Sequence, residues 1–213
     1  ARIKRAMSIM GRSEEDAELD ASKLIYPAMQ VADMVEMDLD VALGGMDQRH
    51  AHMLLRDIAP KQGWKKIVAV HWSLLPSLLG GGRMDSYDIK MSKSKPETCI
   101  FLHDEPDEIE KKINKAFCPE KEVEDNPVLE TVRLIIFRKR KELKVERHEK
   151  YGGDVAYASF DELRTAYSEG ELHPADLKSA TSRSLAEILR PCRQYFERHP
   201  DNREKISQIL GLG

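Results

Sequence analysis

The order of apolar and polar residues in the first half of the chain predicts an α/β unit. Residues 39–43 and 66–72 are short apolar runs, which are typical of strands in a parallel sheet that is covered on both faces. The first run ends at Gly44 and Gly45, two flexible residues that we expect to terminate the strand. Apolar residues at helical spacing predict helices over residues 3–10, 24–34 and 46–58.

The second half of the chain has a different pattern, in which helical spacing dominates. Helix-start residues and apolar periodicity predict helices that begin near residues 104, 128, 159 and 173. We expect Gly170 to end the third of these helices and Pro191 to kink or break the fourth. Residues 143–147 and 154–157 alternate apolar with polar side chains and predict a small hairpin. The chain thus divides into an α/β part, residues 1–102, and a mostly helical part, residues 103–213.

Composition narrows the class of protein. The 213 residues are 41% hydrophobic and 33% charged, and they include no apolar run near the ~18 residues that a membrane span needs. The three cysteines are odd in number and far apart, which fits neither a disulfide framework nor a zinc site built on C-x-x-C pairs. We therefore expect a cytoplasmic protein. The chain begins with Ala1 rather than methionine and lacks the apolar core of a signal peptide, so we expect it to continue a longer protein.

Charge gives no simple argument for nucleic-acid binding. The formal net charge is −3, whereas a protein held by phosphates alone is usually basic. Any RNA contact must therefore come from local basic patches. Two candidates are Lys111, Lys112 and Lys115 on one segment and residues 138–141 on another, although an ordinary solvated helix face explains either of them.

Residues 90–94 are the most informative stretch of the chain. Lys90, Met91, Ser92, Lys93 and Ser94 place two ammonium groups and two hydroxyls within five residues, as a phosphate-binding loop would. Taken alone, the stretch also fits an exposed lysine loop. It matches the K-M-S-K-S signature of class I aminoacyl-tRNA synthetases. The segments on both sides of it resemble the archaeal and eukaryotic type of tyrosyl-tRNA synthetase, and this resemblance covers nearly the whole chain.

The resemblance implies both a fold and an activity. Residues 1–102 would be the second half of a class I Rossmann-type parallel-sheet domain with the K-M-S-K-S loop, and residues 103–213 a mostly α-helical anticodon-binding domain. Such enzymes activate tyrosine with ATP to tyrosyl-adenylate and transfer it to tRNA(Tyr). ATP is then a substrate that comes with Mg²⁺, no metal is bound by the protein itself, and the enzyme is a homodimer. The family's H-I-G-H-type motif, which grips ATP, is expected before Ala1, and nothing in this chain matches it.

Two alternatives stay open. One is a non-catalytic RNA-binding or assembly module that keeps the anticodon platform without activating an amino acid. The other is a synthetase for tryptophan. Asp33 argues against tryptophan, since a pocket for an indole needs no acceptor for a phenol.

A polar stripe in the predicted helix 24–34 is the first candidate site. Tyr26, Gln30 and Asp33 are spaced i, i+4, i+7, which puts them on one face of a helix that apolar residues otherwise surround. A solvent-facing stripe is the alternative. The row resembles the family's Y-P-x-M-Q-x-x-D segment, which implies that Tyr26 and Gln30 cup the ammonium of tyrosine and that Asp33 accepts a hydrogen bond from its phenol.

Gln48 is a further candidate, because it follows Gly44 and Gly45 at the carboxyl end of a predicted parallel strand. Open α/β sheets bind their ligands at that edge. A glutamine that caps its own helix is the alternative. The surrounding G-G-M-D-Q-R resembles the family and implies a further ligand for the substrate amino group.

Lys90 and Lys93 are the candidate catalytic residues, and residues 90–94 together are the candidate ATP-binding loop. Attack of a carboxylate on the α-phosphate of ATP builds negative charge on phosphoryl oxygens, and ammonium groups that close over them stabilise the transition state. Many archaeal and eukaryotic relatives have serine at the fourth position of the motif, where this chain has Lys93. This departure leaves open how the two lysines divide the work.

Tyr151, His173 and Asp176 are the candidate RNA-reading residues. The first precedes two glycines and the second precedes a proline, so both would lie on turns, where a hairpin-tip tyrosine and a helix-capping histidine are the alternatives. K-Y-G-G-D and E-L-H-P-x-D-L-K resemble family segments in which two rings stack on the first anticodon base and the aspartate bonds its edge. Stacking and edge hydrogen bonds are the usual means of reading an unpaired base.

The histidines give no support for a metal site. His50 and His52 are two residues apart on a predicted helix and would face different ways. The remaining histidines, His71 among them, have no partner at ligand spacing. We expect no metal ligands in this chain.

Overall fold

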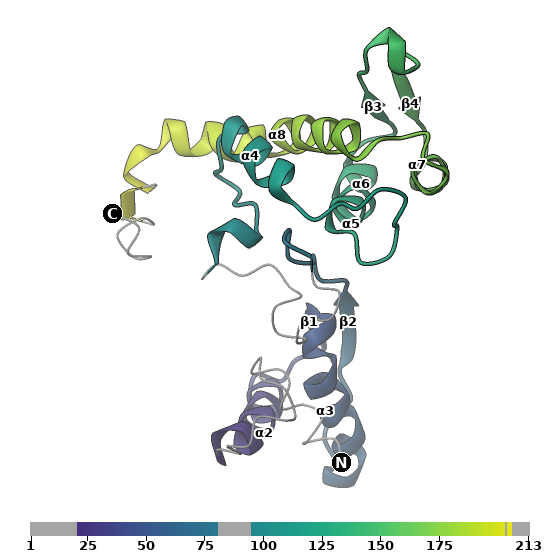
Figure 1. Cartoon of the computed structure of the whole chain (residues 1–213). Coiled ribbons are helices and arrows are strands. Elements are labelled where there is room, and N and C mark those ends of the chain that lie inside the picture. The colour runs from purple at the N-terminus through teal and green to yellow at the C-terminus, as the bar shows by residue number, and fades with distance from the viewer. Residues whose placement is uncertain (1–20, 81–94, 203, 206–213) are drawn as a thin grey trace. The chain divides into compact units, whose positions relative to one another are not determined.

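The computed structural model describes residues 21–80, 95–202 and 204–205, with side chains from residue 25 onward (Figure 1). Two predictions lie outside these residues, namely the helix over residues 3–10 and the lysine loop of residues 90–94. The described residues form two compact units, which divide after Leu74. Residues 75–80 and those from 95 onward make up the second unit.

The first unit contains two helices and two parallel strands. The elements in chain order are α2 (Ala21–Glu36), β1 (Val41–Gly45), the 3₁₀-helix η2 (Met46–Gln48), α3 (Arg49–Gln62) and β2 (Val68–Trp72). The register pairs Val41 with Val68 and Gly45 with Trp72. The predicted strand–helix–strand unit is therefore confirmed. A parallel pair needs such a crossover, because a tight turn would return the chain antiparallel.

Three local boundaries differ from the prediction. The helix α2 begins at Ala21, so Pro27 lies inside it rather than near its start. Gly44 and Gly45 belong to β1 instead of following it, because both remain paired with β2. The helix α3 extends past residue 58 to Gln62 and ends at Gly63, whose φ of 68° is a left-handed conformation that favours glycine.

One face of the two-stranded sheet packs against the helices. The buried core joins Val31 and Met34 of α2 to Leu55 of α3, together with Ala42 and Ile67. The alternate strand positions are exposed, and they are Val41, Leu43, Val68, Val70 and Trp72. Within residues 21–74, the sheet is thus covered on one face only, and the expectation of two covered faces is not met there.

The second unit is mostly helical, and its helices begin close to the predicted residues. They are α4 (Pro106–Lys115), α5 (Pro127–Thr131), α6 (Phe137–Lys139), α7 (Phe160–Glu169) and α8 (Pro174–Arg198). The π-helix η4 (Val132–Ile136) joins α5 to α6, and the 3₁₀-helix η3 (Pro96–Thr98) precedes α4. The helix α8 runs through Pro191 without a break. Figure 1 shows α4 lying along α8, the pair with the most extensive packing.

The predicted hairpin is also confirmed. The strands β3 (Leu143–Val145) and β4 (Val155–Tyr157) pair antiparallel, and the 3₁₀-helix η5 (Glu149–Tyr151) lies between them. Two strands of three residues would be marginal alone. Leu143, Val145 and Tyr157 are buried in the core of the helical unit, which holds the hairpin in place.

Side chains cap the first turns of three helices in this unit. The Asn126 side chain accepts hydrogen bonds from two backbone amides of α5, and the Ser159 hydroxyl accepts one from Glu162. Glu105 and Glu108 form a reciprocal capping box at the start of α4. Each cap satisfies amide groups that a helix end leaves without an internal partner.

Some residues before the predicted boundary at 102 pack with the helical unit, from as early as Leu78. Leu78 is fully buried in its core, and the Leu78 carbonyl accepts a hydrogen bond of 2.7 Å from the Phe117 amide. The buried Asp104 carboxylate accepts hydrogen bonds from the Phe101 amide at 2.9 Å and from Lys112 Nζ at 2.6 Å. The compact units therefore divide earlier in the chain, while residue 102 as a functional boundary stays a prediction. No helix in the described residues is long and apolar enough to cross a membrane.

Candidate functional site

The first unit brings two of the predicted tyrosine ligands together. The Gln30 Nε2 of α2 donates a hydrogen bond of 3.0 Å to Gln48 Oε1 of η2, across 18 positions of sequence. The Oε1 of Gln30 is buried and has no hydrogen-bond partner among the described residues. A buried oxygen without a partner is destabilising by about 1–3 kcal/mol, so this atom is an acceptor that a bound donor would satisfy.

Gly44 allows the backbone of β1 to approach this pair. A Cβ added at Gly44 would lie 2.9 Å from Gln48 Cβ and 3.2 Å from His52 Cε1. Distances this short require the neighbours to move. Glycine at this position therefore lets the Gln48 side chain lie against the end of the strand.

Tyr26 and Asp33 lie on α2 in the predicted row with Gln30, and the helix places all three as expected. Tyr26 is 38% exposed, Asp33 is exposed, and Gln30 is half-buried. The half-buried amide of Gln30 thus lies between two accessible groups on the same helix. The structure places these three groups on α2 and, among the described residues, joins Gln30 to Gln48 of η2 by a hydrogen bond.

A histidine pair that the sequence reasoning missed lies beside this site. His52 Nδ1 and His71 Nε2 are 3.0 Å apart, so one ring donates a hydrogen bond to the other. His71 is paired with Gly44 in the strand register, which brings β2 next to α3 at this point. Burial, followed by the charge of His71, lowers the pKa of His52. The contact joins residues 19 positions apart, and only the pairing of β1 with β2 could have suggested it.

The pair does not complete a metal site within the described part of the chain. No three side chains of His, Cys, Asp or Glu converge among residues 21–80, 95–202 and 204–205. Lys90, Met91, Ser92, Lys93 and Ser94 lie outside these residues, so their roles in ATP binding and catalysis stay predictions.

The second unit gathers the predicted RNA-reading residues around one cavity. Tyr151, His173 and Asp176 line a hollow of about 440 Å³, together with Arg147 and Glu171 and with Gly170 and Ala175. Tyr151 comes from η5 at the tip of the hairpin, while His173 and Asp176 come from the start of α8. Elements that are distant in sequence therefore present two rings and a carboxylate to the same space.

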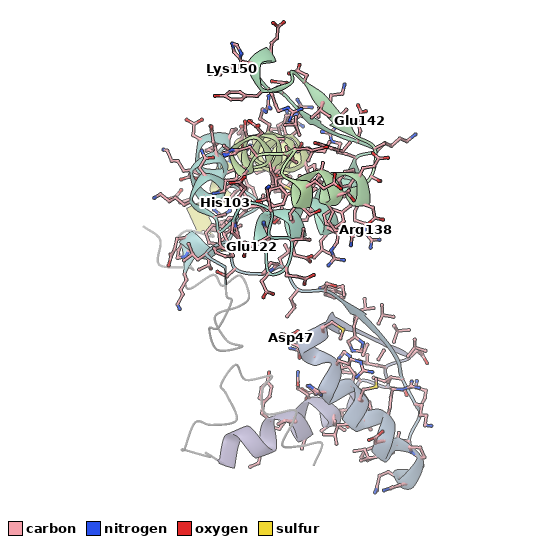
Figure 2. All side chains as sticks on the ribbon, turned by 45° about the vertical axis from the view of Figure 1, so that its right-hand side comes forward. Asp47, His103, Glu122, Arg138, Glu142 and Lys150 are labelled. Carbon is pink, nitrogen blue, oxygen red and sulfur yellow. The ribbon has the colours of Figure 1, made fainter. Side chains whose placement is uncertain are left out.

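Tyr151 is accessible for stacking. Its side chain is 63% exposed, and Lys150 Nζ lies 4.6 Å from the centre of its ring. Figure 2 shows Lys150 at the tip of the hairpin. An ammonium over one ring face stabilises it by a cation–π interaction and leaves the opposite face for another group.

His173 has two roles in the structure. Its Nδ1 accepts a hydrogen bond of 3.1 Å from the Ala175 amide, which makes it the N-cap of α8. This bond requires Nδ1 without a proton, so Nε2 carries the proton of the neutral ring. The exposed ring also lines the cavity. Capping and stacking are therefore compatible readings of one side chain rather than alternatives.

The basic patches are smaller than the sequence indicates. Lys112 is only 18% exposed in its side chain and pairs with the buried Asp104, so it does not belong to a solvent-facing patch with Lys111. Arg140 Nη2 lies 2.7 Å from Glu187 Oε2, which neutralises part of the run at residues 138–141. Helical spacing reveals neither partner, because Asp104 precedes the helix of Lys112 and Glu187 is 47 positions from Arg140.

Comparison with known proteins defines the class. The family model described as "tRNA synthetases class I (W and Y)" matches residues 1–190. The chain therefore belongs to the class I aminoacyl-tRNA synthetases of the tryptophan and tyrosine group, and the predicted combination of an α/β unit with a helical domain is confirmed.

Individual relatives point to the tyrosine branch. A tyrosine–tRNA ligase of Saccharolobus islandicus is 53% identical over 98% of this chain and 61% of its own length. One from Sulfurisphaera tokodaii is 57% identical over 92% of this chain and 56% of its own. The chain thus spans about 60% of the length of the curated relatives that it matches.

Solved structures agree with this. Tyrosyl-tRNA synthetase of Pyrococcus horikoshii, complexed with L-tyrosine, has a TM-score of 0.81 and 43% identity, with 95% of this chain and 60% of that chain covered. The enzyme of Aeropyrum pernix has a TM-score of 0.81 and 48% identity, with 99% of this chain and 58% of that chain covered.

Proposed function

We propose that this chain supplies the tyrosine-binding edge and the anticodon-binding unit of a tyrosine–tRNA ligase. The observation that carries the proposal is the buried Gln30 Oε1 without a partner in the described residues, held beside Gln48 at the end of a parallel strand. An amino-acid ammonium has three N–H donors and needs acceptors of this kind. The names of the relatives, and the tyrosine bound in one of them, support tyrosine as the amino acid.

In this proposal the row binds the two polar ends of the substrate tyrosine. Tyr26 and Gln30 cup the ammonium, and Gln48 accepts a further hydrogen bond from it. Asp33, one turn further along α2, accepts a hydrogen bond from the substrate phenol and selects tyrosine over phenylalanine. Tryptophan has no phenol, so Asp33 favours the tyrosine branch of the family.

The chemistry would proceed in two steps. A carboxylate oxygen of tyrosine attacks the α-phosphorus of ATP, an O–P bond forms, and pyrophosphate leaves. A hydroxyl of the terminal ribose of tRNA(Tyr) then attacks the tyrosyl carbonyl, and AMP leaves. Lys90 and Lys93 would stabilise the phosphoryl oxygens during the first step. Mg²⁺ would enter as its complex with ATP. The resemblance also supports a cytoplasmic homodimer.

The anticodon part of the proposal rests on the cavity of the helical unit. Tyr151 and His173 would stack on an unpaired base, and Asp176 would accept a hydrogen bond from its edge. Because the net charge is −3, we expect stacking to carry a visible share of the affinity.

The replacement Asp33→Ala tests the tyrosine site. Pyrophosphate exchange is measured with tyrosine and with phenylalanine, on this chain and on any longer natural form of it. We expect the preference for tyrosine to fall by roughly 10- to 100-fold, as for the loss of a hydrogen bond to a charged group, while the KM for ATP changes little. An unchanged preference would show that Asp33 does not read the phenol. Glu36→Ala, at another exposed acidic position of the same helix, is the matched control.

A further inference from the structure

Arg147 makes an unusual set of hydrogen bonds next to the cavity of the helical unit. Its amide donates to Asp154 Oδ1 at 2.9 Å, and its Nε donates to the Gly153 carbonyl at 2.9 Å. Its Nη1 donates to the Glu171 carbonyl, also at 2.9 Å. The bonds from Nε and Nη1 reach two different segments of the chain, 6 and 24 residues away.

These two segments carry the rings of the proposed RNA site. Gly153 lies two residues after Tyr151, on the tip of the hairpin, and Glu171 lies two residues before His173, in the turn that leads into α8. The guanidinium therefore ties the backbone beside one ring to the backbone beside the other. A planar guanidinium fixes the directions of its bonds, so it also fixes the spacing between the segments.

Two glycines in left-handed conformations form the hairpin tip beside this side chain. Gly152 and Gly153 have φ values of 98° and 71°, which other residues rarely adopt. A Cβ at Gly152 would lie 3.4 Å from Arg147 Nη2. The Gly152 backbone therefore lies within van der Waals reach of the guanidinium, whereas a Cβ at Gly153 would meet no atom within 4 Å.

Arg147 also differs from the arginines nearby in the type of partner that its side chain binds. Arg183 pairs with Glu146 on the same hairpin, and Arg140 pairs with Glu187. Among the described residues, Arg147 makes hydrogen bonds to backbone carbonyls and is in no ion pair with a carboxylate. Its contacts are therefore with the backbone that holds the site.

We propose that Arg147 is a positioning residue that sets the distance between the rings of Tyr151 and His173, and so determines which unpaired base the cavity accepts. The proposal rests on the RNA-reading function proposed above. Without the clamp, the tip between the two buried strands could adjust the ring of Tyr151 to a changed base as well as to the matched one, which lowers the ratio of the two affinities.

The test compares Arg147→Lys with Arg183→Lys in the full chain. Both changes keep the charge, but lysine cannot donate two bonds with fixed directions. The probes are an RNA stem-loop with a tyrosine anticodon and stem-loops in which the first anticodon base is changed. We expect Arg147→Lys to lower the ratio of matched to changed affinity by about tenfold, with the salt dependence of binding unchanged, because only positioning is lost. Arg183→Lys should leave both quantities unchanged.

Three results overturn the proposal. One is an unchanged ratio in Arg147→Lys. Another is a flatter salt dependence with an unchanged ratio, which would indicate a phosphate contact. The third is unfolding of both Arg147→Lys and Arg147→Gln by circular dichroism, which would make Arg147 a residue needed for folding. Tyr151→Ala separates this proposal from the RNA function on which it rests. If Tyr151→Ala also leaves the ratio of matched to changed affinity unchanged, the RNA function is refuted. If Tyr151→Ala lowers that ratio while Arg147→Lys does not, only the positioning role of Arg147 is refuted.

Discussion

Replacing His173 by asparagine separates the two roles that the structure gives this side chain. In the native chain, Nδ1 caps α8 through a bond of 3.1 Å to the Ala175 amide, and the exposed ring lines the cavity. Asparagine is among the best N-cap residues, so His173→Asn keeps an acceptor at the helix start and removes the ring. His173→Ala removes both. Comparison of the two variants therefore isolates the contribution of the ring.

The expected magnitudes differ for stability and for binding. Loss of an N-cap destabilises by about 0.5–2 kcal/mol, and about 1 kcal/mol lowers the Tm of a domain with between 100 and 200 residues by roughly 2–6 °C. We therefore expect a lower Tm for His173→Ala and a Tm near the native value for His173→Asn. Loss of one stacked ring weakens RNA binding by about 1–3 kcal/mol, or roughly 5- to 150-fold, in both variants.

Two assays on the 213-residue chain check this prediction. Thermal melting followed by circular dichroism gives the stability, and fluorescence anisotropy with a labelled anticodon stem-loop gives the affinity at several salt concentrations. The ring carries no phosphate contact in this account, so the salt dependence should stay the same. If His173→Asn binds the stem-loop as tightly as the native chain, His173 is a helix cap and nothing more, and the RNA-reading role is refuted.

Other predictions concern packing, pH and the tyrosine site. Lys112→Met leaves the buried Asp104 carboxylate without its ion-pair partner and should destabilise the helical unit by about 3–5 kcal/mol in urea unfolding. The double variant Lys112→Met, Asp104→Asn should recover part of that loss. If the single and the double variant are equally destabilised, the role of the ion pair is contradicted. The lowered pKa of His52 means that, below the ordinary histidine pKa, the unfolded chain binds more protons than the folded chain. The free energy of unfolding should therefore fall as pH decreases through that range, and His52→Gln should reduce this pH dependence in melts at several pH values. An identical pH dependence in the native chain and His52→Gln would refute the prediction. Gln48→Ala removes the hydrogen bond with Gln30 and should raise the KM for tyrosine by about fivefold, with little effect on the KM for ATP. An equal rise in the two KM values would argue against an ammonium site at Gln48.

Local signals in the sequence predicted the elements of the fold. Ser159 and Gly170 mark the ends of α7 because an N-cap hydroxyl and a left-handed glycine act within a few residues. The alternation of apolar and polar residues predicted the hairpin for the same reason. Such features depend on neighbours in sequence, so they can be read without knowing the tertiary structure.

The contacts that define the candidate sites are different, because they join distant parts of the chain. The pairing of His52 with His71 depends on β1 and β2 lying side by side, and the Arg140–Glu187 ion pair joins residues 47 positions apart. The clamp of Arg147 on Glu171 spans 24 residues. No periodicity predicts these contacts, since they result from packing. The resemblance to a family supplied the candidate residues, and the structure supplied their partners.

Pyrophosphate exchange with individual amino acids tests the central claim most directly. The assay is run on this chain and on any longer natural form of it, with tyrosine, phenylalanine and tryptophan at equal concentrations and with ATP and Mg²⁺ in excess. The account predicts exchange that depends on tyrosine, is far weaker with phenylalanine and is absent with tryptophan. Exchange that depends on tryptophan would contradict the claim that the chain belongs to a tyrosine–tRNA ligase. The claim would also be contradicted by a natural form that binds an anticodon stem-loop tightly but supports exchange with none of the three amino acids.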